Sequence, residues 1–136
     1  NGPQVAAFGE TVIATWFSAP EGRAESYFAV SKDGGLTFSE AQALHNGDRA
    51  GGSVGRVGSA FNREGAALLS WVGSDGTVHG RIWREAGLGT AFEIGAIDPS
   101  RASGFPRAAG LDAGFLVAWT EPESGIRTVL ITPRAE

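Results

Sequence analysis

The chain has 136 residues, a formal net charge of −4 and a hydrophobic fraction of 42%, with 21 Gly, 6 Pro and no Cys. This composition is typical of one globular domain with many turns, and the acidic balance argues against a nucleic-acid surface, which needs a basic patch. The lack of Cys excludes disulfides and thiolate metal sites, and no apolar run reaches the roughly 18 residues of a membrane-spanning helix.

Three segments of the chain repeat the same order of parts: small apolar residues, a turn, an apolar strand that reaches a Trp, a polar loop and another apolar strand. Trp16, Trp71 and Trp119 mark the repeat at intervals typical of four-stranded propeller blades of roughly 40 to 50 residues. A β-sandwich also has short strands separated by turns, but the repeat favours a propeller. We therefore predict an all-β chain with four-stranded antiparallel blades.

The strands that carry the Trp residues are predicted at 11–17, 67–72 and 115–120, with the sequences TVIATWF, ALLSWV and FLVAWT. Successive side chains of a strand point to opposite faces of its sheet. Both sets of alternating side chains are largely apolar in these strands, so we expect each strand to be covered on both faces.

Residues 31–38, SKDGGLTF, lie between a predicted third strand at 26–30 and a plausible fourth strand at 40–44. Gly34 and Gly35 supply the positive φ angles of a hairpin turn, and the carboxylate of an Asp accepts hydrogen bonds from nearby N–H groups. We expect the Ser and Thr hydroxyls to close the turn and the Phe ring to fold under it.

The spacing S-x-D-x-G-x-T-F resembles the Asp-box, or bacterial neuraminidase repeat, of the sialidase superfamily. The matching residues are Ser31, Asp33, Gly35, Thr37 and Phe38. This resemblance implies a six-bladed propeller of sialidase type in which the box is a structural turn on the outer rim, and it implies secretion to an extracytoplasmic compartment. Residues 85–92, EAGLGTAF, align as a degenerate copy with Gly89 opposite Gly35, Phe92 opposite Phe38 and Gly87 in place of Asp33.

The chain then represents about half of a propeller, a single partial domain over residues 1–136 with blades at approximately 3–44, 56–96 and 106–136. An open fan leaves blade faces and strand edges uncovered. We expect the remaining blades to come from the same longer chain, another subunit or a second copy. The start at NGPQ without Met and an end before the last fourth strand favour the longer chain.

The resemblance implies a ligand face built by the loops between blades, 45–56 and 97–107, and by the loops after the second strands. Ionisable residues there include His45, Asp48, Arg49, Arg56, Arg101, Arg107, Glu121 and Glu123. Arg56 and Arg107 stand near the starts of innermost strands, where two guanidinium groups can bind a carboxylate. Arg49 and Arg101 are further candidates for this anion site; a solvated rim or ion pairs with nearby acids are the alternative. In the first segment Gln4 aligns with Arg107.

The family's catalysis requires three Arg, a Tyr nucleophile activated by Glu, an Asp acid/base and an F/Y-R-I-P motif, and that motif is absent. Tyr27, the only Tyr, is predicted to be a packing residue. His45 and His79 lack a third metal ligand, and DGG lacks the acidic positions of a calcium loop. We assign no catalytic residue, metal or cofactor, and predict a non-catalytic binding or scaffold module for a glycan or protein. The alternative is a portion of an exo-sialidase-type glycoside hydrolase whose catalytic residues lie elsewhere.

Overall fold

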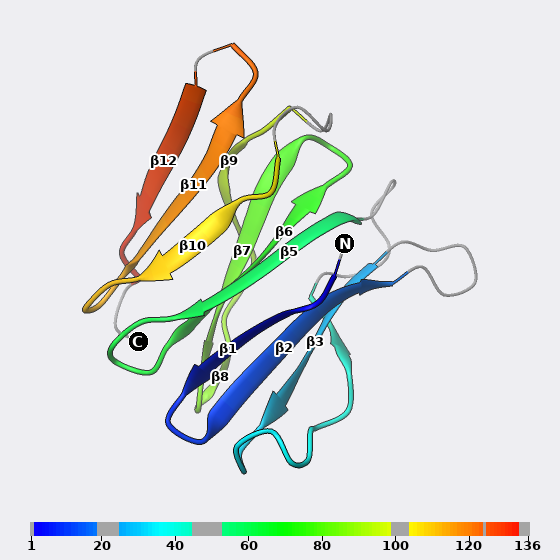
Figure 1. Ribbon diagram of the computed structural model, residues 1–136, viewed down its shortest axis with the longest axis vertical. Coiled ribbons are helices and arrows are strands. Elements are labelled where there is room, and N and C mark those ends of the chain that lie inside the picture. The colour runs from blue at the N-terminus through cyan, green and yellow to red at the C-terminus, as the bar shows by residue number, and fades with distance from the viewer. Residues whose placement is uncertain (1, 19–24, 45–52, 99–103, 124, 134–136) are drawn as a thin grey trace.

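The computed structural model describes residues 2–18, 25–44, 53–98, 104–123 and 125–133. Within these ranges the chain forms β-strands and no helix, arranged in three antiparallel sheets (Figure 1). The predicted all-β antiparallel fold is confirmed. No helix in the described ranges is long and apolar enough to cross a membrane.

Each predicted segment contains one sheet. The first sheet has the order β1 (Gln4–Phe8), β2 (Thr11–Ser18), β3 (Glu25–Ser31) and β4 (Gln42–Ala43). The middle sheet consists of β5 (Ser53–Phe61), β6 (Ala67–Gly73) and β7 (Thr77–Arg84), with β8 (Gly87–Leu88) and β9 (Phe92–Ala96) both paired to β7. The third sheet has the order β10 (Arg107–Gly110), β11 (Phe115–Glu121) and β12 (Gly125–Ile131).

The middle sheet is covered on both faces, and its strand β6 is buried at every residue. Leu68 and Val72 belong to one apolar cluster with Phe115, Val117 and Trp119 of β11. The intervening side chains of β6 belong to a second apolar cluster that contains Ile13 and Phe28 of the first sheet; these side chains are Ala67, Leu69 and Trp71. Alternation along one strand therefore divides the core into two layers.

The sheets follow one another with the same orientation. We call the side that bears Trp16, Trp71 or Trp119 the Trp face of its sheet, and the other side the back face. The Trp face of the middle sheet packs on the back face of the first, and the Trp face of the third packs on the back face of the middle. Lys32 and Glu85 form an ion pair between the first two sheets, and Arg81 donates a 3.1 Å hydrogen bond to the Leu44 carbonyl.

This stacking leaves the back face of the third sheet exposed. Ile126, Leu130 and Leu116 of that face are among the exposed large apolar residues. The prediction that the Trp-bearing strands are covered on both faces holds for β6 and is wrong for β11. The difference is that no described sheet packs on the back face of the third sheet. The prediction is also wrong for β2, since no described sheet covers the face that bears Trp16.

The first strands of the sheets, β1, β5 and β10, lie side by side across the front of the molecule (Figure 1). Their far ends approach closely: Asn62 donates a 3.0 Å hydrogen bond to the Ala113 carbonyl, and the Arg63 N–H donates to the Leu111 carbonyl at 3.0 Å. At Gly110 an added Cβ would lie 1.8 Å from the Phe61 carbonyl oxygen. Glycine is required there because the backbones of β5 and β10 leave no space for a side chain.

We expect Gly110→Ala to lower the free energy of unfolding by about 1 to 3 kcal/mol, because the methyl group forces the two innermost strands apart. Gly2→Ala is the matched control, since a Cβ at Gly2 meets nothing within 4 Å, and its effect should stay within about 0.5 kcal/mol. Urea unfolding followed by circular dichroism measures both. Equal stabilities of the two variants would contradict the close approach.

Candidate anion-binding site

The hairpin between β3 and β4 is closed by a network of side-chain hydrogen bonds. The Ser31 hydroxyl donates to Asp33 Oδ1 at 2.8 Å and accepts from the Gly35 N–H at 2.8 Å. Thr37 donates to the Asp33 carboxylate through both its N–H (2.9 Å) and its hydroxyl (2.6 Å). Gly34 and Gly35 have φ values of 75° and 96°, as the sequence predicts, and Phe38 is 45% exposed.

These hydrogen bonds lower the pKa of Asp33 to about 2 from the ordinary 3.8. The largest cause is the Thr37 hydroxyl, followed by the Thr37 N–H and the Ser31 hydroxyl. Each donor stabilises the charged carboxylate relative to its protonated form. All of these donors lie within the hairpin's own loop, so the carboxylate holds the turn.

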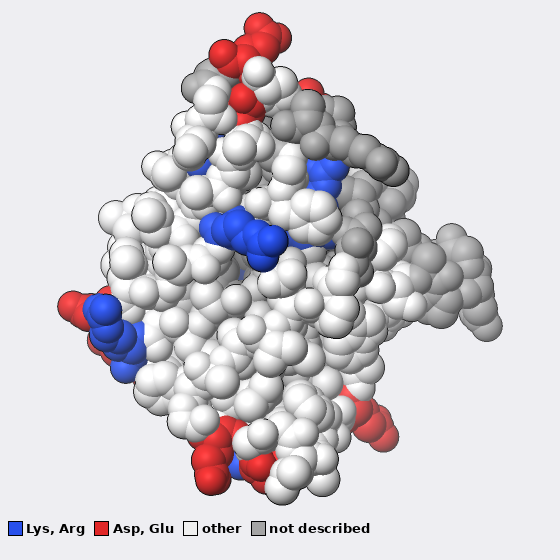
Figure 2. Space-filling model, in the orientation of Figure 1, with Lys and Arg blue, Asp and Glu red and all other residues white. Residues whose placement is uncertain are grey.

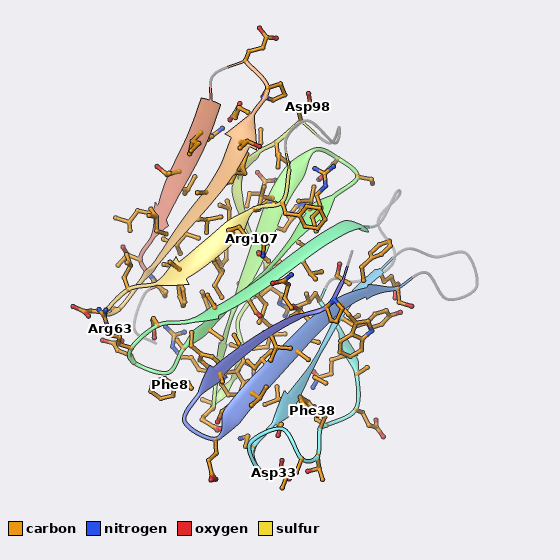
Figure 3. All side chains as sticks on the ribbon, viewed as in Figure 1. Phe8, Asp33, Phe38, Arg63, Asp98 and Arg107 are labelled. Atoms are coloured by element: carbon orange, nitrogen blue, oxygen red, sulfur yellow. The ribbon has the colours of Figure 1, made fainter. Side chains whose placement is uncertain are left out.

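The hairpin lies at the end of the first sheet where β1 turns into β2, because the Gly34 N–H donates to the Glu10 carbonyl at 2.8 Å. Arg107 is the first residue of β10 and lies opposite Ala118, next to Trp119, toward the other end of its sheet. Figure 3 labels Asp33 near the bottom of the view and Arg107 near its middle. The turn network and the candidate arginine are thus separate features.

The second hairpin does not match the alignment predicted for residues 85–92. The Gly89 N–H donates to the Ile82 carbonyl, as the Ser39 N–H donates to the Val30 carbonyl in the first sheet. Val30 and Ile82 are equivalent, since they lie opposite Ile13 and Leu68 on the second strands. Gly89 therefore occupies the place of Ser39 and not of Gly35, and the shorter connection has no room for the same turn network.

A Trp stacks on a planar polar group of the neighbouring strand in every sheet. Trp16 stacks on Tyr27 with ring centroids 6.1 Å apart, and Trp71 stacks on His79 at 5.4 Å. In the third sheet the Arg127 guanidinium lies 5.5 Å from the Trp119 ring centroid. The registers place each partner directly opposite its Trp, so these pairs are equivalent.

A carboxylate accompanies each of these stacked pairs. The Tyr27 hydroxyl donates to Glu25 at 2.6 Å, His79 lies 3.4 Å from Asp75, and Arg127 lies 3.9 Å from Glu121. A tyrosine bonded to a glutamate is the nucleophile pair that the family resemblance implies. The positions equivalent to Tyr27 hold His79 and Arg127, each also beside a carboxylate. The simplest role of Tyr27 and Glu25 is therefore to orient a packed ring.

Arg107 lies where the first strands of the sheets begin. Its side chain is exposed, and its Nη1 donates to Gln4 Oε1 of β1 at 3.4 Å. The registers make the two residues equivalent, because Gln4 lies opposite Thr15 and Arg107 opposite Ala118, each directly before a Trp. The predicted alignment of Gln4 with Arg107 agrees with this pairing.

Arg56 is largely buried within β5. It is only 9% exposed, has φ 52°, and its Cζ lies 5.8 Å from the Phe105 ring centroid. The pairing of β5 with β6 shifts register between Gly55 and Gly58, so Gly58 rather than Arg56 is the equivalent of Arg107. The two arginines are thus not an equivalent exposed pair.

The other predicted ligand-face residues divide into two groups. Those that lie outside the described residues are His45, Asp48, Arg49 and Arg101. Glu121 interacts with Arg127, and Glu123 is exposed in the connection from β11 to β12. In the described ranges no three His, Asp or Glu side chains are grouped so that they could hold a metal ion.

The electrostatics of this face suit an anion. Figure 2 shows basic side chains near the centre of the face and acidic side chains near its outline, and Figure 3, in the same orientation, labels Arg107 at the centre. An exposed guanidinium offers several N–H donors in a fixed plane, which matches the two oxygens of a carboxylate. Gln4 adds an amide, and the exposed Phe105 ring adds apolar surface beside Arg56.

The sequence did not predict the contact between Arg107 and Gln4 or the stacked pairs. Both depend on which residues face each other across strands, and that register is not written in the spacing of single residues. The stacked pairs do have a common spacing in the sequence, because the residue stacked on each Trp lies 8 to 11 positions after it.

Comparisons with models of known protein families, with curated proteins and with solved structures found no match to this chain. The geometry of the residues described above is therefore the basis for a functional assignment.

We expect the stability contributed by Asp33 to disappear in acid. Its folded pKa of about 2 lies below the ordinary 3.8, so the ionised group stabilises the fold above about pH 4, and this contribution is lost as the pH falls toward 2. The unfolding temperature of the unmodified chain should therefore exceed that of Asp33→Asn at about pH 6, and the difference should shrink between about pH 4 and 2.

Thermal unfolding at a series of pH values measures this difference. Glu40→Gln is the control, since it removes an exposed carboxylate from the same connection without removing a bond to Ser31 or Thr37. A pH-independent difference for Asp33→Asn, or an equal loss in the control, would contradict the role assigned to the carboxylate.

Proposed function

We propose that this chain is part of a sialidase-like Asp-box β-propeller that acts as a non-catalytic binding module in an extracytoplasmic compartment. The ligand that we favour is a glycan bearing a carboxylate. It would bind where β1, β5 and β10 begin, at the opposite end from the Asp33 hairpin.

The propeller assignment is supported by the arrangement of the sheets. Each sheet is an antiparallel meander from one segment, the first strands lie adjacent, and both apolar interfaces between the described sheets join a Trp face to a back face. The hydrogen bonds of the 31–38 turn involve Ser31, Asp33, Gly35 and Thr37, which are positions of the Asp-box pattern.

The observation that carries the ligand proposal is the position of Arg107. An exposed guanidinium reaches from β10 to Gln4 of β1, two residues from opposite ends of the sequence. A carboxylate that replaces the weak 3.4 Å contact to a neutral amide gains a charge-assisted hydrogen bond. The local basic surface favours such a ligand although the whole chain is acidic.

A glycoside hydrolase of sialidase type is the second candidate, and the 2.6 Å hydrogen bond from Tyr27 to Glu25 is the observation that favours it. Tyr27 lies on the Trp face of the first sheet, opposite Trp16, whereas Arg107 lies on the third sheet opposite Ala118. Since the described residues do not bring the phenol to the candidate anion site, we favour binding without catalysis.

Arg107→Ala should weaken binding of the methyl glycoside of sialic acid roughly 10-fold to 100-fold, which corresponds to loss of a charged hydrogen bond worth about 1.5 to 3 kcal/mol. Arg63→Ala is the matched control, since Arg63 is an exposed arginine paired with Asp112 at the far end of the first strands. Isothermal titration calorimetry measures both affinities.

The methyl ester of the same sugar tests whether the carboxylate itself is recognised. The affinity of the ester for the unmodified chain should be no higher than the affinity of the acid for the Arg107→Ala variant. Equal affinities for acid and ester, or an equal loss in the control variant, would contradict the site. Turnover of an aryl sialoside that Tyr27→Phe abolishes would establish the hydrolase instead.

A further inference from the structure

Two exposed leucines of the third sheet occupy positions that are buried elsewhere. Leu116 is equivalent to Ile13 and Leu68, since each lies three residues before its Trp. Ile13 and Leu68 are both 0% exposed, whereas Leu116 is 39% exposed. The position opposite Leu116 shows the same contrast, because Leu130 is 63% exposed while its equivalent in the middle sheet, Ile82, is buried.

The buried residues Ile13, Leu68 and Ile82 are each covered by the Trp face of the next sheet. Ile13 packs in one cluster with Trp71, and Leu68 and Ile82 pack in another with Trp119. Leu116 and Leu130 therefore belong to a back face that keeps apolar side chains for the same kind of cover. In both described interfaces the covering sheet presents a Trp on its second strand.

The chain itself has one Trp face that no described sheet covers, on the first sheet. Val5 of β1 is exposed on that face, and Trp16 and Tyr27 are only partly buried. The equivalents of Val5 are Ser59, which lies opposite Leu69, and Ala108, which lies opposite Val117. Ala108 packs against the apolar cluster between the middle and third sheets. Val5 is thus placed for contact with a preceding back face.

Charge does not oppose a contact between these two free faces. From the registers, the charged residues among the described ones are Arg107 on the back face of the third sheet and Glu25 on the Trp face of the first. Their charges are opposite, and Glu25 is largely buried. The remaining side chains on both faces are apolar or uncharged.

We propose that a second copy of this chain docks the Trp face of its first sheet on the back face of the third sheet, head to tail. In this contact a Trp face packs on a back face, as it does between the first and middle sheets and between the middle and third sheets. The contact is heterologous, because two different surfaces meet. Copies joined in this way form a closed ring or an open chain and not a pair joined through identical surfaces. The proposal does not rest on anion binding, although Arg107 lies on the same back face of the third sheet.

Two variants that each remove one surface test the proposal. Leu130→Asp places a charge on the back face, and Val5→Asp places one on the Trp face; both residues are exposed in the single chain. At about 100 µM, which favours complexes with a Kd near 10 µM, sedimentation velocity should give the unmodified chain a mass at least twice its own 14.0 kDa. Each variant alone should sediment as a monomer.

The mixture of the two variants gives the sharpest result. It should form a 1:1 complex, because the intact back face of Val5→Asp meets the intact Trp face of Leu130→Asp. Leu36→Asp, at an exposed hairpin tip outside both faces, should associate as the unmodified chain does. Circular dichroism verifies folding, and Ile126→Asp replaces Leu130→Asp if that variant unfolds.

Three results would overturn the proposal. A monomeric unmodified chain at this concentration would exclude the contact. Association of either variant alone would mean that one surface pairs with itself. Failure of the mixed variants to associate, while the unmodified chain does, would mean that other surfaces join the copies.

Discussion

Strand β6 is buried on both faces along its whole length, and both outer sheets pack against it. Leu68 and Val72 anchor the third sheet, while Leu69 and Trp71 anchor the first. Burial of one Leu side chain stabilises a fold by about 1.5 to 3 kcal/mol. The outer sheets each receive this stabilisation on one face only, so the middle sheet supports both.

The same alternation gives the stack a direction and separates its two ends. The middle and third sheets turn their Trp toward the preceding sheet. In all three sheets the Trp ring stacks on a cross-strand partner: Tyr27, His79 or Arg127. At the opposite end lie the Asp33 turn network and the close contact at Gly110. The end that fixes the backbone is thus distinct from the end where Arg107 is exposed and available to a ligand.

The sequence predicted the parts of the fold that depend on local chemistry. The strands around Trp16, Trp71 and Trp119 follow from alternating apolar residues, and the 31–38 turn follows from its two glycines and its Asp. These features are set by neighbours within a few residues. They do not require knowledge of which strands meet.

What the sequence did not predict depends on register and on connection length. The shift between Gly55 and Gly58 moves Arg56 out of the position equivalent to Arg107 and leaves it buried beside Phe105. The shorter second hairpin displaces Gly89 from the place expected for it. A one-residue change in pairing reverses the face to which a side chain points, so the candidate site was predicted only at Arg107.

The middle sheet holds the two outer sheets in one cooperative unit, and native-state hydrogen exchange measures the opening of each strand separately. We predict that the amides of β6 exchange slowest in the chain and only through global unfolding, with a free energy equal to that from urea denaturation. Slower exchange in β2 or β11 than in β6 would contradict this account, because it would show that an outer sheet persists without the middle one.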